Sequence, residues 1–196
     1  MSIDINKFCA TGDIRTQLNA PWHEDGKTVA TDGALIVILD GLLDIPEPSA
    51  PLTISIKKVD KPLPDSGWVR MDSIDIPAPN LCHCCNGTGL MYADDCDDCG
   101  GTGFHTIGNH DYDCQECNAN GYVVIGAGMG TERECDVCGG SKTLFQEAQI
   151  CCASFQTKYL RMIADLPECE IAVGDELMPA PFRFTGGHGW LMPVRK

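Results

Sequence analysis

The chain has 196 residues, of which 43% are hydrophobic and 21% charged, the composition of a globular protein with enough apolar residues for one core. Lys and Arg number 14 against 28 Asp and Glu, and the formal net charge of -14 disfavours a protein that holds nucleic acid by charge alone. Residues 1–20 lack the apolar stretch of a secretory signal, and no apolar run has the length of a membrane span. We therefore expect a cytoplasmic protein with no membrane partner, whose 13 cysteines bind metal rather than form disulfides.

The N-terminal residues 1–79 are expected to form the first half of a folded domain. The predicted elements are a helix over 2–10 and strands over 14–20, 28–31, 34–39 and 53–59. Ile5 and either Phe8 or Cys9 would face the core from the helix, and Asp25-Gly26 predicts a hairpin turn before the second strand. The prolines at the end of this segment indicate an extended connection.

Eight of the cysteines form four CxxC pairs in the middle of the chain. The pairs are Cys82/Cys85, Cys96/Cys99, Cys114/Cys117 and Cys135/Cys138. Between residues 80 and 142 there are ten acidic residues and two basic ones, and the stretch is rich in glycine. Such a segment cannot fold by burial of apolar side chains alone, so we expect metal binding to hold it.

Each pair begins a repeated unit of eight residues. The units read CHCCNGTG at 82–89, CDDCGGTG at 96–103, CQECNANG at 114–121 and CDVCGGSK at 135–142. Two cysteines three residues apart on a glycine turn can aim both sulfurs at one ion, as in a zinc knuckle. Eight thiolates make two closed tetrahedral zinc sites, which are structural rather than catalytic. The alternative is a redox or iron–sulfur role.

The remaining polar side chains of this segment are expected to stay outside the metal sites. Cys84 is either a competing ligand or a bystander, and we expect a bystander. The histidines His83, His105 and His110 are expected to be solvated, and Asp94, Asp95, Asp97 and Asp98 to form a solvated acidic loop. Cys9, Cys151, Cys152 and Cys169 are expected to be small buried hydrophobic residues.

The four units resemble the cysteine-rich domain of DnaJ-type co-chaperones over about residues 81–143, with departures at Ala119 and Lys142. In that family the first and fourth repeats share one zinc ion, and the second and third share the other. The resemblance implies a first site of Cys82, Cys85, Cys135 and Cys138 and a second site of Cys96, Cys99, Cys114 and Cys117. The sequence contains no His-Pro-Asp triplet, so the family's J-domain activity is not implied.

After the repeats, residues 144–196 are expected to complete the domain begun by residues 1–79. The predicted elements are a strand over 149–153, a helix over 154–165 and strands over 170–173, 181–184 and 189–194. The apolar face of the helix would comprise Phe155, Tyr159, Met162 and Ile163. Lys158 and Arg161 would share another face of the same helix.

This order of elements resembles one repeat of a bacterial DNA sliding clamp. The matching pieces are KTVATDGALIVIL at 27–39, FQTKYLRMIADLP at 155–167 and GWLMPVR at 189–195. The resemblance implies an α+β fold in which two helices pack on an antiparallel sheet, with residues 80–143 as a zinc-binding insert. A generic α+β sandwich is the alternative. A ring of such single repeats would need six copies, so a homo-oligomer is one expectation.

These features predict a zinc-binding adaptor protein that is not an enzyme and that binds a protein partner. The first hypothesis is an accessory factor in DNA metabolism, from a phage or prophage, with Lys158 and Arg161 contacting DNA phosphates or a partner. A solvated helix face is the competing interpretation of this pair. The second hypothesis is a chaperone-like module that binds unfolded or partner polypeptides through the zinc domain. The third is a small monomeric regulator that acts by protein contact alone.

Overall fold

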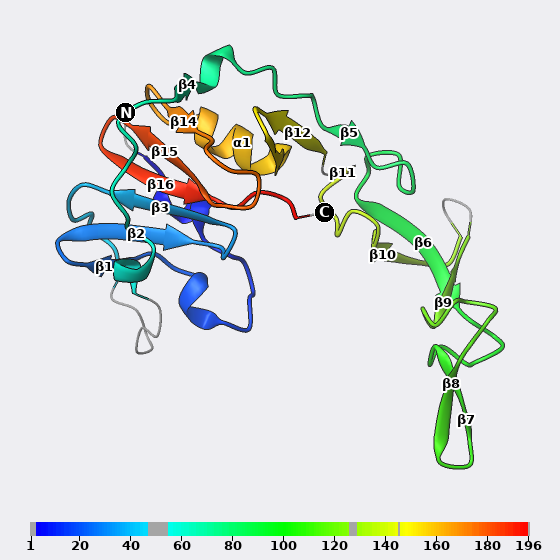
Figure 1. The fold of residues 1–196 in the computed structure, drawn as a ribbon. Coiled ribbons are helices and arrows are strands. Elements are labelled where there is room, and N and C mark those ends of the chain that lie inside the picture. Colours follow the sequence, from blue (N-terminus) through cyan, green and yellow to red (C-terminus); the bar gives the residue numbers. More distant parts are fainter. Residues whose placement is uncertain (1–2, 47–54, 126–128, 145, 196) are drawn as a thin grey trace. The chain divides into compact units, whose positions relative to one another are not determined.

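A computed structural model describes residues 3–46, 55–125, 129–144 and 146–195 (Figure 1). The chain divides into two compact units. Unit 1 comprises residues 1–78 and 145–196, and unit 2 comprises residues 79–144. No helix within the described ranges has the length and apolar composition that a membrane crossing requires.

Unit 1 is built around a seven-stranded sheet in the order β1-β2-β3-β16-β15-β14-β4, in which every neighbouring pair is antiparallel. Its strands are β1 (Trp22–Glu24), β2 (Lys27–Thr31), β3 (Leu35–Leu39), β4 (Trp68–Arg70), β14 (Glu170–Ala172), β15 (Ala180–Phe184) and β16 (Gly187–Leu191). A separate hairpin comprises β12 (Glu147–Ile150) and β13 (Ala153–Gln156). The helical segments are α1 (Thr157–Ala164) and the 3-10 helices η1 (Ile5–Phe8), η2 (Thr16–Leu18), η3 (Ile56–Lys58) and η4 (Met71–Ser73).

Strand β3 shows why the sheet is stable, because apolar residues lie on both of its faces. Leu35, Val37 and Leu39 join the main core, which also contains Leu160 and Ile163 of α1. Alternate residues of a strand point to opposite faces. Ile38 therefore packs in a second cluster with Trp22, Val29, Ile56 and Trp190. The apolar run at 35–39 is thus a central strand buried on both sides.

The predicted clamp-like α+β fold is wrong. Within the described residues α1 is the single α-helix, and the main regular elements of unit 1 are antiparallel strands. The expected N-terminal helix is the four-residue η1, which ends where Cys9 adopts an extended conformation. Ile5 and Phe8 are both buried, but their spacing of three residues suits a 3-10 helix as well as an α-helix. The apolar spacing therefore could not establish two α-helices on a sheet.

Several local predictions also change. The segment 14–20 contains η2 rather than a strand, and the described end of the predicted strand at 53–59 contains η3, while 53–54 lie outside the described residues. Phe155 belongs to β13, and the buried residues of α1 are Thr157, Leu160 and Ile163. The hairpin turn at Asp25-Gly26 is confirmed between β1 and β2.

Unit 2 consists of short strands and turns, with no helix among its described residues. Its strands are β5 (Asn80–Leu81), β6 (Leu90–Asp95), β7 (Phe104–Ile107), β8 (His110–Asp113), β9 (Tyr122–Val124), β10 (Thr131–Glu134) and β11 (Thr143–Leu144). They form a three-stranded sheet β10-β6-β9 and the pairs β11-β5 and β7-β8. The buried residues are chiefly cysteines, together with Met91, Ala93 and the glycines Gly89, Gly103 and Gly121. The described residues of unit 2 therefore form no apolar core comparable with that of unit 1.

Candidate metal centres

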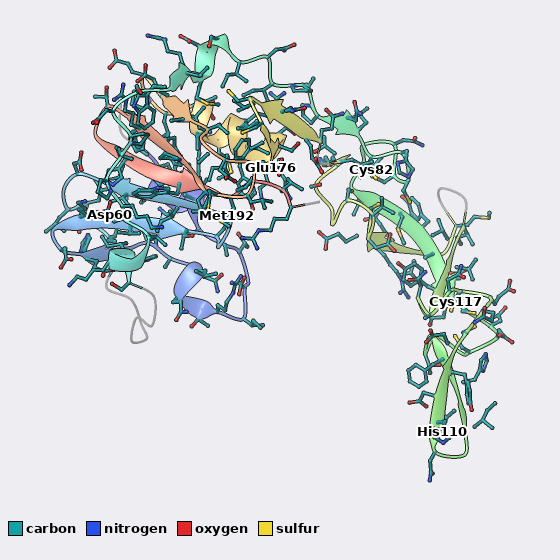
Figure 2. All side chains as sticks on the ribbon, in the orientation of Figure 1. Asp60, Cys82, His110, Cys117, Glu176 and Met192 are labelled. Carbon is teal, nitrogen blue, oxygen red and sulfur yellow. The ribbon has the colours of Figure 1, made fainter. Side chains whose placement is uncertain are left out.

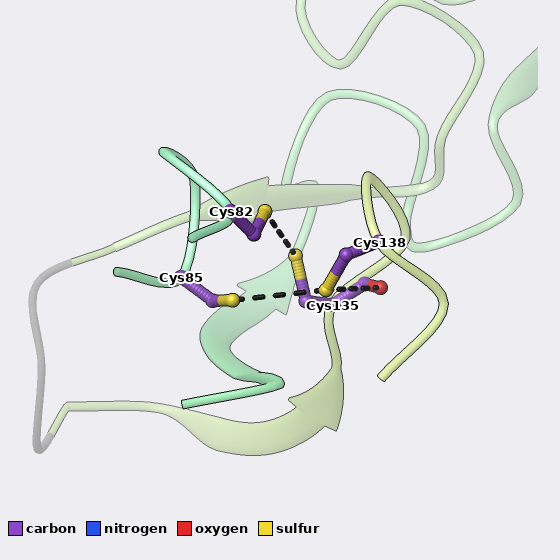
Figure 3. Close-up of side chains that lie close together, drawn as sticks. All are labelled: Cys82, Cys85, Cys135 and Cys138. Atoms are coloured by element: carbon purple, nitrogen blue, oxygen red, sulfur yellow. Dashed lines mark hydrogen bonds between the residues drawn. The ribbon is translucent and has the colours of Figure 1, made fainter. Parts of the chain in front are cut away.

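The first group of four cysteines brings together the two ends of unit 2. Cys82, Cys85, Cys135 and Cys138 are all buried, and their sulfur atoms lie within 4.8 Å of one another (Figure 3). The Sγ atoms of Cys82 and Cys135 are 3.8 Å apart, and those of Cys85 and Cys138 are 3.7 Å apart. A tetrahedral zinc ion with Zn–S bonds of about 2.3 Å requires sulfur atoms about 3.8 Å apart. The group therefore has the size of a four-thiolate zinc site.

The second group comprises Cys96, Cys99, Cys114 and Cys117 and has the same geometry. Cys99 is half-buried and the other three are buried. The Cys96–Cys114 and Cys99–Cys117 sulfur distances are both 3.8 Å. Figure 2 labels Cys82 and Cys117, one residue from each group. The donor sets fit two zinc ions, each held by four thiolates that leave no position open for a substrate.

The backbone explains why the repeats associate as first with fourth and second with third. The Cys82 amide donates to the carbonyl oxygen of Lys142, and the Cys135 amide donates to that of Gly89, each at 2.9 Å. Both bonds join the first cysteine of one repeat to the last residue of its partner repeat.

The second and third repeats form the equivalent reciprocal bonds. The Cys96 amide donates to Gly121 O, and the Cys114 amide donates to Gly103 O, each at 2.9 Å. Each pair of repeats is therefore aligned by two backbone hydrogen bonds, in addition to the cysteines that the two repeats bring together.

Within a repeat, the last residue supplies an amide to the second cysteine. Gly89 N–H donates to Cys85 Sγ at 3.3 Å, Gly103 N–H to Cys99 Sγ at 3.2 Å, and Gly121 N–H to Cys117 Sγ at 3.3 Å. An amide that points at a sulfur stabilises the thiolate form, which is the form that binds metal. The glycine turns thus prepare the cysteines for ligation.

The pKa of Cys85 shows this effect. Burial alone would raise the pKa, but hydrogen bonds from Gly89 N–H and from Cys138 lower it to about 6. Cys99 has the same arrangement: burial opposes and Gly103 N–H favours the thiolate, and the pKa is lowered to about 6. Each centre therefore contains one cysteine that is readily deprotonated at neutral pH.

Two side chains beside the centres have contacts that the sequence did not indicate. Asp98 Oδ2 lies 3.3 Å from Cys114 Sγ and 3.0 Å from His105 Nε2, so His105 contacts a carboxylate instead of being free in solvent. Cys84 is half-buried and packs against the first centre. Burial, followed by the contact with Cys135, raises the pKa of the Cys84 thiol. His83 and His110 are exposed, as are the acidic residues at 94, 95, 97 and 98.

The two basic residues suggested for DNA or partner contact lie on α1 in different surroundings. Arg161 is half-buried, and its Nη2 donates to the carbonyl oxygens of Ile76, at 3.0 Å, and Pro77. Lys158 is exposed, with its Nζ 5.2 Å from the ring centroid of Tyr159. Arg161 therefore links α1 to the segment that follows η4, and both belong to unit 1.

Comparisons of the chain with protein-family models, with curated proteins and with solved structures found no match. The two four-cysteine centres are therefore established by their own geometry: buried or half-buried cysteines, tetrahedral sulfur spacing and amide donors.

Proposed function

We propose that the chain is a non-enzymatic zinc-binding adaptor, in which the β7–β8 hairpin of unit 2 binds an extended segment of a partner protein. The observation that carries this proposal is the exposure of apolar side chains on that hairpin. Phe104, Ile107 and Tyr112 are 43%, 67% and 54% exposed. Exposed aromatic and aliphatic residues gathered on one element are typical of a protein-binding surface.

The hairpin is anchored by the second metal centre. It spans residues 104–113, between the second and third repeats, and Cys114 N–H donates to Gly103 O at its base. An isolated two-stranded hairpin is only marginally stable in water. Because zinc would fix both ends of the hairpin, the exposed surface can be presented without a hydrophobic core of its own.

The charges around the hairpin favour a basic partner. Asp111 and Asp113 lie on β8, both exposed, and Asp97 and Asp98 lie in the second repeat. Among the described strands β7 and β8 pair only with each other, so each has an edge with free backbone groups. An extended segment with alternating apolar and basic residues could add to such an edge as a third strand.

The resemblance to DnaJ-type cysteine-rich domains supports a second candidate, a chaperone-like module that binds many unfolded chains. The same exposed apolar residues favour it, since unfolded polypeptides are recognised by apolar contact. An accessory role in DNA metabolism, in a phage or prophage, stays a prediction, because no described contact singles out nucleic acid.

The test compares the zinc-loaded chain with a double variant, Ile107→Ser with Tyr112→Ser. Both side chains are exposed, so the fold should persist. The matched control is Ile14→Ser, which alters an isoleucine of unit 1 that is 96% exposed. We expect the double variant to lose saturable, salt-sensitive binding to one purified partner, and the control to keep it.

Two further assays distinguish the candidate functions. Suppressed aggregation of several unrelated unfolded proteins by the wild type, lost in the same double variant, would favour the chaperone-like module. Salt-sensitive binding of a short DNA duplex would favour the role in DNA metabolism. Equal partner binding by the wild type and the double variant would refute the hairpin as the binding surface.

A further inference from the structure

Each metal centre has one additional side chain next to it, contributed by the same position of a repeat. Cys84 is the third residue of CHCC in the first repeat, and Asp98 is the third residue of CDDC in the second. Cys84 Sγ, Cys135 Sγ and a carboxylate oxygen of Asp136 lie within 4.8 Å of one another. Asp98, His105 and Cys114 form the equivalent group at the second centre.

The neighbouring ligands are equivalent as well. Cys135 is the first cysteine of the fourth repeat, and Cys114 is the first cysteine of the third repeat. The sulfur of Cys135 lies beside Cys84, and the sulfur of Cys114 lies beside Asp98. At this position of the repeat the two centres differ: a thiol lies beside the ligand of the first, and a carboxylate beside the ligand of the second.

We propose that Cys84 and Cys135 form a modification site, at which a peroxide joins the two sulfur atoms in a disulfide and frees the zinc ion of the first centre. Cys84 is not one of the four ligands, so its side chain can rotate toward Cys135 without breaking a metal bond first. It is also half-buried, whereas Cys135 is fully buried, and it gives a small oxidant access to the pair.

The reaction is balanced with peroxide as the oxidant. The O–O bond of the peroxide breaks as one sulfur takes up an OH group and becomes a sulfenic acid. The other sulfur attacks it, so that the S–S bond forms and the S–O bond breaks with loss of water, and Cys135 would then no longer hold zinc. The two sulfurs lose two electrons, which reduce the peroxide to two water molecules. The Cys84 thiol supplies one proton and the solvent supplies another. Three thiolates then remain at the first centre, and its affinity for zinc falls.

The second centre serves as an internal control. Its ligands could also form disulfides with one another, because Cys96 and Cys114 are as close, at 3.8 Å, as Cys82 and Cys135 are in the first centre. The one more exposed ligand, Cys99, belongs to the second centre, so ligand exposure alone would make the second centre the more sensitive one, opposite to the proposal. Asp98 cannot form a disulfide, so the second centre should keep its zinc longer.

The experiment treats the zinc-loaded full chain with stoichiometric hydrogen peroxide, follows released zinc with a chromogenic chelator and maps disulfides by peptide mass spectrometry. We expect a fast phase that releases one of two zinc ions, accompanied by a Cys84–Cys135 disulfide and reversed by a thiol reductant with added zinc. Cys84→Ser should lose the fast phase. Cys152→Ser, which removes an exposed cysteine of unit 1, should keep it.

A further variant tests whether a thiol at the equivalent position makes the second centre sensitive to peroxide. Asp98→Cys in the Cys84→Ser background should restore a fast phase, now with a disulfide between the introduced thiol and Cys114. The proposal is overturned if both zinc ions leave the wild type at one rate, if Cys84→Ser keeps the fast phase, or if the mapped disulfide joins two ligands instead. Disulfide mapping in the wild type tests the proposed Cys84–Cys135 disulfide even if a variant does not fold.

Discussion

Gly121 packs directly against the carbonyl oxygen of Gly101. A Cβ atom on Gly121 would lie 2.4 Å from that oxygen, a distance that real Cβ atoms do not adopt. The opposite contact is equivalent, because a Cβ on Gly103 would lie 2.5 Å from Ala119 O. The last glycine of each repeat is thus required where the second and third repeats meet backbone to backbone around their metal centre.

Gly121→Ala should therefore weaken the second metal centre. The new methyl group forces the two repeats apart, at a cost of roughly 1–3 kcal/mol for overpacking, in addition to about 1–2 kcal/mol for a side chain at positive φ. The matched control is Gly100→Ala: Gly100 also has positive φ, but nothing lies within 4 Å of its Cβ position. Zinc affinity measured by competition with a chelator should fall much further in Gly121→Ala. Equal losses in both variants would contradict the packing argument.

The metal centres were the most predictable part of the molecule. Four CxxC pairs with glycines at fixed offsets limit the chemistry to a few metals, and the resemblance to DnaJ-type repeats supplied the grouping that the structure shows. The departures at Ala119 and Lys142 do not disturb the turns, because both residues keep positive φ, 63° and 68°. The contacts of Cys84 and Asp98 could not be predicted, because a motif of paired cysteines does not show which side chain lies beside the neighbouring repeat.

The architecture of unit 1 was less predictable. The hairpin at Asp25-Gly26 and the apolar run predicted as a strand over 34–39 carry strong local signals, and the structure has the hairpin and a strand at Leu35–Leu39. The helix predicted over 154–165 is present as α1 (Thr157–Ala164), but the N-terminal α-helix was wrong, because a short apolar spacing such as that of Ile5 and Phe8 does not distinguish a 3-10 helix from an α-helix. Phe155 likewise matched a helical face, but its burial comes from β13. Tertiary packing, which a single sequence does not display, decided these elements.

Cys96→Ser should remove one zinc ion per chain and unfold part of unit 2 while unit 1 stays folded. Cys96 is a fully buried member of the second group, and a serine hydroxyl is a poor zinc ligand at neutral pH. Elemental analysis should give one zinc ion per chain. The tryptophans Trp22, Trp68 and Trp190 all lie in unit 1, so their fluorescence should be unchanged. Retention of two zinc ions would refute the ligand assignment.

Asp60 should make unit 1 sensitive to acid. Its carboxylate accepts hydrogen bonds from Lys27 Nζ at 2.8 Å and His188 Nε2 at 3.0 Å. Partial burial alone would raise the pKa of Asp60, but these two bonds outweigh it and lower the pKa below its ordinary value. A carboxyl group with a lowered pKa in the folded state adds stability above its unfolded pKa of about 3.9, and that stability is lost as the pH falls through the folded pKa.

Asp60→Asn should accordingly cost about 1 kcal/mol at neutral pH, and the difference from the wild type should vanish at strongly acidic pH. Denaturant unfolding followed by tryptophan fluorescence at several pH values measures this difference in unit 1. Asp44→Asn, at an exposed position, is the control and should show little effect at any pH. A stability difference that persisted unchanged at the most acidic pH would mean that the charge of Asp60 is not its cause.

Arg161→Ala should destabilise unit 1 by about 2 kcal/mol, because it removes the hydrogen bonds from the guanidinium to the carbonyl oxygens of Ile76 and Pro77. The segment leaving η4 would then detach from α1 and become sensitive to limited proteolysis near residue 76. Lys158→Ala, on the exposed face of α1, is the matched control and should change stability by only a few tenths of a kcal/mol. If the two residues instead acted together in contacting DNA, both variants would weaken duplex binding alike and neither would alter the unfolding of unit 1.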